Sequence, residues 1–108
     1  MSNKAAFQEA KPAVLELVRA TAKSHSVVTY PQVAQAHPVL PKTGVAMGRA
    51  VGALLGEINE DEGILISAVV VQKGTLLPGP GFFGLPGAPR TLDRYNSLLR
   101  RVWKKYGP

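Results

Sequence analysis

Apolar residues recur at helical spacing in four parts of the chain and form β-rich runs in two others. In the first helical stretch, Val14, Val18 and Ala22 fall on one face. Residues 64–72, ILISAVVVQ, are almost entirely apolar and rich in β-branched side chains, which predicts a buried strand. The predicted helices span about 12–24, 31–36, 43–59 and 92–106, and the predicted strands are about 26–30 and 64–72.

Prolines, glycines and threonines mark where these elements begin and end. Pro31 suits the first turn of a helix, and Thr43 and Thr91 are expected to be N-caps. Residues 1–11 are interpreted as a flexible arm or a loosely attached turn. Residues 76–90, LLPGPGFFGLPGAPR, are expected to form a long loop.

This order of elements predicts one domain over residues 1–108, of the α/β class but mainly helical. Two helices joined by the turn HPVLPKTG, then a strand and a wing-like loop, match the plan of a winged helix-turn-helix domain. A short β-sheet and a basic C-terminal helix complete the expected fold. The exposed face of the helix 43–59 is poor in residues that read base edges, so sequence-specific binding is not expected.

The helix 43–59 also carries glycine at every fourth position. These residues are Gly44, Gly48, Gly52 and Gly56. Each costs a helix about 1 kcal/mol relative to alanine. The row is therefore expected to allow close backbone approach, either by another helix or by a ligand.

The composition indicates a globular protein and excludes several kinds of covalent, metal-binding and nucleophilic site. Hydrophobic residues make up 45% of the 108 residues and charged residues 19%. The absence of cysteine excludes disulfides, thiolate metal sites and cysteine nucleophiles, and fits a cytoplasmic protein. No apolar run has the length of a signal peptide core or a membrane span, so no membrane partner is expected.

The net charge of +6 is concentrated at the C-terminal end. From Arg90 onward, Asp93 is the single acid among Arg90, Arg94, Arg100, Arg101, Lys104 and Lys105. A nearly neutral body with a basic end suggests a polyanionic partner. The alternative is a solvated helix surface that aids solubility.

No catalytic or metal-binding arrangement is convincing in the sequence. His25 and His37 are expected at the surface, and the acidic run NEDEG is expected to end a helix rather than to bind metal. We find no Ser/His/Asp arrangement, carboxylate pair or phosphate-binding glycine loop. The sequence therefore predicts a protein that is not an enzyme and that uses neither metal nor cofactor.

Two segments carry a resemblance to a known family. VVTYPQVAQA and AMGRAVGALL resemble the signature segments of the DNA-binding C-terminal domain of alkylguanine-DNA alkyltransferases and alkyltransferase-like proteins. In that family, Thr-Tyr-Gly-x-hydrophobic-Ala opens the first helix of the helix-turn-helix, and Arg-Ala-Val-Gly lies on the second. The resemblance covers about residues 26–99, with Pro31 where the family usually has glycine and extra loop at HPVLPKTGV.

The resemblance implies roles for particular residues. The family's groove-contacting tyrosine falls on Tyr30 and its arginine finger, which fills the space left by a rotated nucleotide, falls on Arg49. The reactive Pro-Cys-His-Arg-Val-Val motif falls on LISAVV, which puts Ile66, Ser67 and Ala68 at the Cys, His and Arg positions. Without a thiolate, alkyl transfer by that mechanism is excluded.

We therefore expect a non-enzymatic DNA-binding protein that contacts duplex DNA mainly through the phosphates, in the cytoplasm and associated with the nucleoid. The expected contacts are Tyr30, Lys42, Arg49, Lys73, Arg90, Arg94, Arg101, Lys104 and Lys105.

The alternative is a bacterial or phage regulatory module that binds another protein through Phe82 and Phe83. These two side chains could instead only pin the long loop to the core. Trp103 is expected to anchor the last helix, with a role in binding as the alternative.

Overall fold

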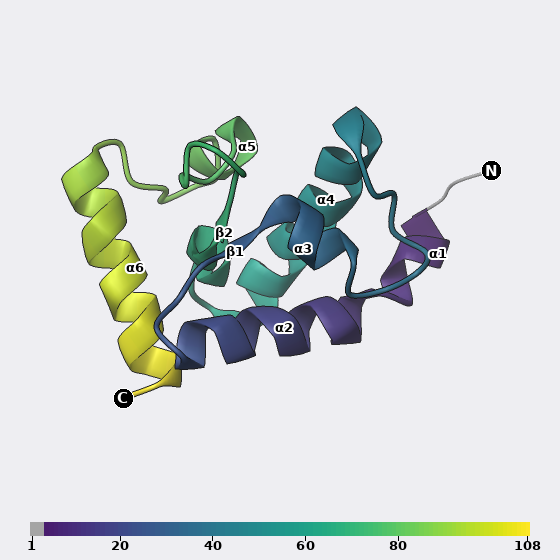
Figure 1. Ribbon diagram of the computed structural model, residues 1–108. Coiled ribbons are helices and arrows are strands. Elements are labelled where there is room, and N and C mark those ends of the chain that lie inside the picture. Colours follow the sequence, from purple (N-terminus) through teal and green to yellow (C-terminus); the bar gives the residue numbers. More distant parts are fainter. Residues whose placement is uncertain (1–3) are drawn as a thin grey trace.

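A computed structural model describes residues 4–108, which form helices arranged around a very small sheet (Figure 1). The α-helices are α1 (Lys4–Gln8), α2 (Lys11–Lys23), α3 (Tyr30–Ala34), α4 (Gly44–Glu62), α5 (Pro80–Phe83) and α6 (Leu92–Tyr106). The remaining elements are β1 (Val28–Thr29), β2 (Val70–Val71) and the 3₁₀-helix η1 (Ile66–Val69). The mainly helical α/β class is thus confirmed.

The N-terminal region is more ordered than the sequence predicted. Residues 4–8 form helix α1, Ala10 is fully buried, and Phe7 packs against the core. The expected arm therefore does not extend over residues 4–11, and its first three residues lie outside the described part of the chain.

Helix α3 is short and begins with a complete capping box. Thr29 accepts a hydrogen bond from the amide of Gln32, and the Gln32 side chain accepts one from the amide of Thr29. These reciprocal bonds satisfy amides that a helix start leaves unpaired, and they fix Tyr30 at the first helical position. Helix α3 packs against α4 as the first helix of the predicted pair.

Helix α4 runs three residues further than predicted. It continues through NEDE and ends at Gly63, which has φ of +68° and so takes the left-handed conformation that glycine favours. Thr43 stands at the N-cap position but makes no side-chain capping bond.

The strand predicted over residues 64–72 is mostly wrong. Residues 66–69 form η1, and only Val70 and Val71 pair with β1, in parallel, with Val28 opposite Val70. A short, continuously apolar run fits a buried turn of helix as well as a buried strand. Its sequence pattern therefore cannot distinguish the two conformations. The structure places η1 in the centre of the molecule, packed by α2, α4 and α6.

The wing-like loop contains a short helix and no strand. Residues 80–83 form α5, and among the described residues the sheet has only its two parallel strands. A wing made of a β-hairpin is therefore not seen, and the winged arrangement stays a prediction.

The last helix matches its prediction. Helix α6 spans Leu92–Tyr106, and the Thr91 hydroxyl accepts a hydrogen bond from the amide of Arg94. Trp103 is anchored, because its indole nitrogen donates to the carbonyl of Ser26 and its ring stacks on His25. The C-terminal end of α6 thereby lies beside the end of α2 (Figure 1).

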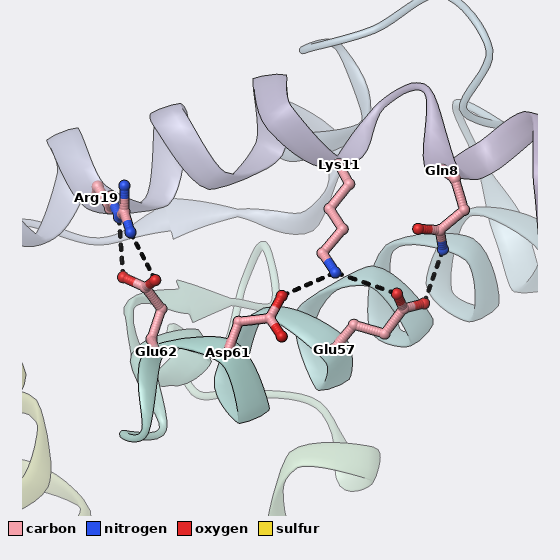
Figure 2. A network of polar contacts seen from close by, with 6 residues as sticks. All are labelled: Gln8, Lys11, Arg19, Glu57, Asp61 and Glu62. Carbon is pink, nitrogen blue, oxygen red and sulfur yellow. Dashed lines mark hydrogen bonds and ion pairs between the residues drawn. The ribbon is translucent and has the colours of Figure 1, made fainter.

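One polar network fastens α1 and α2 to α4 (Figure 2). Glu57 accepts hydrogen bonds from Gln8 and Lys11, and Lys11 also pairs with Asp61 at 2.9 Å. Further along, Arg19 holds Glu62 with two nitrogen–oxygen contacts of 2.8 and 2.6 Å. Asp61 and Glu62 of the acidic run thus join α4 to α2, a role that the sequence did not predict.

Candidate nucleic-acid interface

An open pocket of about 820 Å³ lies between α3, α4, the end of β2 and α5. Its wall is mostly apolar and draws on segments far apart in the sequence, whose elements are labelled in Figure 1. The residues that line it are Tyr30, Pro31, Val45, Met47, Gly48, Arg49, Gly52, Leu55, Gly56, Asn59, Ser67, Gln72, Lys73, Gly79, Pro80, Gly81, Phe82 and Leu85.

Tyr30 forms one side of this pocket. Its hydroxyl lies 3.4 Å from the amide nitrogen of Gly79, which donates to it, and so links the start of α3 to the segment before α5. A side chain at position 79 would crowd the Tyr30 hydroxyl. Burial raises the pKa of Tyr30, and the hydrogen bond from Gly79 opposes this rise. The phenol therefore stays protonated near neutral pH and can donate a hydrogen bond.

Two cations lie at the same pocket. Arg49 is exposed on α4, and Lys73 is exposed just after β2. Neither makes an ion pair with the residues that the structure describes. Both charges are thus available to an anionic partner that covers the pocket.

The glycine row of α4 opens onto this pocket. Gly48, Gly52 and Gly56 line it, and a β-carbon built at each of them would meet nothing within 4 Å. No neighbouring helix in the described residues requires these glycines. Of the two roles predicted for the row, close approach by another helix of this chain is therefore wrong, and approach by an external partner remains.

A buried polar pair lies at the inner end of the pocket. Asn59 donates to the Ser67 hydroxyl at 2.8 Å and accepts from the Ser67 amide at 2.9 Å. Both side chains are less than 10% exposed. Ile66 and Ala68, which flank Ser67, are fully buried and do not line the pocket. Ser67 is buried, as its apolar run predicted, and it also lines the pocket.

The two phenylalanines of the loop have different surroundings. Phe82 is 4% exposed and lines the pocket, whereas Phe83 is 41% exposed. Their rings pack edge-on to each other and to Tyr95, whose hydroxyl donates to the carbonyl of Ala68. Burial is the main cause that raises the pKa of Tyr95 to about 12. Phe82 thus pins the loop to the core.

The remaining predicted contacts lie elsewhere. Arg90, Arg94 and Arg101 line a second groove, beside residues 94–101 of α6. Lys42 donates to the carbonyls of Ala34 and His37, both at 2.6 Å, and so closes the end of α3.

The two lysines at the end of α6 line neither hollow. Lys105 donates to the carbonyl of Glu62 at 3.0 Å and lies over the ring of Tyr106. Lys104 is exposed and lines neither the pocket nor the second groove. The nine predicted contacts therefore do not form one surface cluster.

Residues 4–108 contain no group of three or more His, Cys, Asp or Glu side chains placed to hold a metal ion. No helix in that range has the length and apolar character needed to cross a bilayer. Comparison with protein-family models, with curated proteins and with solved structures finds no match for the chain.

Sequence reasoning missed the inner wall of the pocket. Asn59 was assigned to the end of a helix and Ser67 to a strand, and neither pattern signals that the two side chains meet. Gln72 and Leu85 also line the pocket without any motif that marks them. The glycine row was the one local signal, because it indicated an uncovered face of α4.

Proposed function

We propose that this protein binds duplex DNA without chemical transfer, using the face around the pocket of Tyr30, Arg49 and Lys73. The observation that carries the proposal is the meeting of these three residues at one open apolar pocket, although the first and the last are 43 positions apart in the sequence. Two of them come from the segments that resemble the helix-turn-helix of alkyltransferase-like proteins. The winged arrangement belongs to the same proposal.

The chemistry of this face suits nucleic acid. The cations Arg49 and Lys73 would contact phosphates at the rim, and the apolar wall with its phenol would accept the flat face of a base. The glycine row leaves the backbone of α4 open to close approach. The chain has no cysteine, so this binding involves no thiolate transfer.

The test is a binding titration by fluorescence anisotropy. The probes are plain duplex, single-stranded DNA and duplex that contains one alkylated guanine, each measured from 50 to 300 mM salt. We expect binding that weakens steeply with salt, and a loss of roughly 10-fold or more for Arg49→Ala. Tyr30→Phe removes the hydroxyl but keeps the ring, so it should reduce DNA affinity less than Arg49→Ala does. Among the probes, the reduction should be largest for the one that supplies an unstacked base.

Arg100→Ala is the matched control. Arg100 is an exposed arginine of α6 that lines neither hollow, so its removal should change affinity much less than Arg49→Ala. The proposal is refuted if the wild-type protein binds none of the probes, or if its affinity for them does not change with salt concentration.

A second candidate function is capture of a protein partner, and the exposure of Phe83 favours it. Because Phe82 is buried, such binding would depend on Phe83 alone. Phe83→Ala would then abolish capture of the partner and leave DNA affinity intact, whereas Phe82→Ala would unfold the loop.

A further inference from the structure

A second groove, of about 610 Å³, lies beside residues 94–101 of α6. One wall is the segment Gly87–Thr91 and the other is the face of α6 that carries Arg94, Ser97 and Arg101. Pro89 and Leu98 are buried beneath it. The groove is thus a separate hollow from the pocket described above.

Three arginines line this groove, and all are exposed. They are Arg90, Arg94 and Arg101. None makes an ion pair with any residue that the structure describes. Asp93 is the single acid in the stretch 87–101 and does not line the groove. The groove is therefore strongly positive without internal neutralisation.

The spacing of these charges matches a chain of phosphates. Arg94 and Arg101 are two helical turns apart on one face of α6, roughly 10.5 Å along the axis. The phosphates of one strand follow one another roughly every 3.4 Å along the duplex axis, so an α6 aligned with that axis would place Arg94 and Arg101 about three phosphate steps apart. Guanidinium forks pair with phosphate oxygens through two parallel hydrogen bonds. Ser97 also lines the groove, and its hydroxyl accepts a hydrogen bond from Arg100 at 3.3 Å.

One continuous segment of the chain connects the lining of the pocket to the lining of the groove. Residues 79–82 and Leu85 line the pocket, and residues 87–91 line the groove. An extended polyanion that follows this segment from the pocket would pass over residues 87–91 to α6. This continuity favours a nucleic-acid backbone over a small free anion.

We propose that Arg90, Arg94 and Arg101 form a second phosphodiester site, which holds the backbone of the duplex beside the segment that enters the pocket. This inference rests on the proposed DNA binding and adds to it a separate, sequence-independent contact. It assigns the phosphate contact of α6 to Arg94 and Arg101, apart from Lys104 and Lys105.

The experiment measures the slope of log K against log salt concentration for a duplex probe of about 20 base pairs. Each lost phosphate contact on B-DNA should lower the magnitude of the slope by about 0.9. We expect Arg94→Ala and Arg101→Ala each to weaken binding roughly 5- to 10-fold near 0.1 M salt, and the double variant to lose a slope of about 1.8.

Arg100→Ala again serves as the control, because it removes the same charge from the neighbouring position of the same helix. Arg100 does not line the groove but donates a hydrogen bond to Ser97, which does, so Ser97→Ala measures the effect of losing that bond alone. Its slope should stay near that of the wild type, and Arg94→Lys should keep most of the wild-type slope. The ratio of affinities for alkylated and plain duplex should not change in the groove variants, since these phosphate contacts carry no base information.

The outcomes separate the two proposals. If the wild type binds DNA and the Arg94 and Arg101 variants match Arg100→Ala, the second site is refuted while the proposed function stands. If the wild type binds no DNA, both are refuted. Thermal melting of every variant checks the fold, and these exposed substitutions should leave the melting temperature nearly unchanged.

Discussion

At the scale of single residues, Ser67 is the most informative position in the chain. The sequence shows a serine in an apolar run, and the structure shows its hydroxyl and amide both bonded to Asn59. A buried amide side chain must find partners, and here one residue supplies both. The pair joins the far end of α4 to η1 and sets the inner wall of the pocket.

We expect Ser67→Ala to lower the free energy of unfolding by about 1–3 kcal/mol, because the Asn59 amide group would lose its buried acceptor. Urea denaturation followed by circular dichroism measures the change. Ser97→Ala is a fair comparison, since Ser97 is exposed, and it should shift stability by less than about 0.5 kcal/mol. Equal effects of the two substitutions would contradict the importance of the buried pair.

At the scale of elements, helix α4 combines a buried face with a glycine row. Its buried face is what amphipathic spacing predicted, with Val51, Leu54 and Ile58 among the largest core side chains. Its glycine row reduces helix stability without any packing need inside the described chain. This combination suggests that the open face of α4 is kept for a partner at a cost in stability.

Gly52→Ala should therefore separate stability from binding. We expect the free energy of unfolding to rise by up to about 1 kcal/mol, because alanine favours the helix and the new methyl group meets nothing. DNA binding should weaken, because that methyl group projects into the pocket. Denaturation and anisotropy on the same preparation measure both quantities.

Ala53→Gly is the reciprocal control on the same helix. Ala53 is exposed and does not line the pocket, so glycine there should cost about 1 kcal/mol and leave DNA affinity unchanged. If Gly52→Ala stabilises the protein without weakening DNA binding, the pocket face of α4 is not the interface.

The stretch 64–72 shows the limit of element prediction from sequence. Its composition correctly indicated burial, since Ile66, Val69 and Val70 are fully buried. Its conformation depended on the surrounding helices, which pack it on several sides and leave only two residues to pair with β1. Apolar composition determines where such a run goes, but not which backbone conformation it takes there.

At the scale of the whole molecule, Glu62 joins three helices. It stands at the end of α4, pairs with Arg19 of α2 (Figure 2), and accepts a hydrogen bond from the hydroxyl of Tyr106 of α6 at 2.8 Å. The hydrogen bond with Arg19 is the largest cause that lowers the pKa of Glu62, with a smaller contribution from Tyr106, and desolvation opposes both. Burial and the bond to Glu62 raise the pKa of Tyr106 to about 12.

This junction should make stability depend on pH in the acid range. Because the pKa of Glu62 is lower in the folded protein, its contribution is present above its unfolded pKa of about 4.3 and is lost as the pH falls through the folded value. We expect the melting temperature of the wild type to fall more between pH 6 and pH 3 than that of Glu62→Gln. Arg19→Ala should flatten the profile in the same way. Parallel profiles for all three proteins would show that the junction contributes nothing measurable.

Local sequence patterns predicted the three long helices, although α1, α5 and the end of α4 were not predicted. Amphipathic spacing placed α2, α4 and α6 to within a few residues, and Thr91 caps α6 as predicted, because these features depend on neighbours within one or two turns. The charge asymmetry and the motifs around Tyr30 and Arg49 can also be recognised in the sequence, since each is local in the chain.

Only the tertiary structure decided how these local features combine. It brought Tyr30, Arg49 and Lys73 to one pocket, paired Asn59 with Ser67, and used Lys42 and Lys105 to bind backbone carbonyls at helix ends. It also gave Arg94 and Arg101 of α6 a groove that Lys104 and Lys105 do not line. Such arrangements depend on how segments far apart in the sequence pack against one another. A local sequence pattern does not contain that information, because it reflects only contacts between near neighbours in the chain.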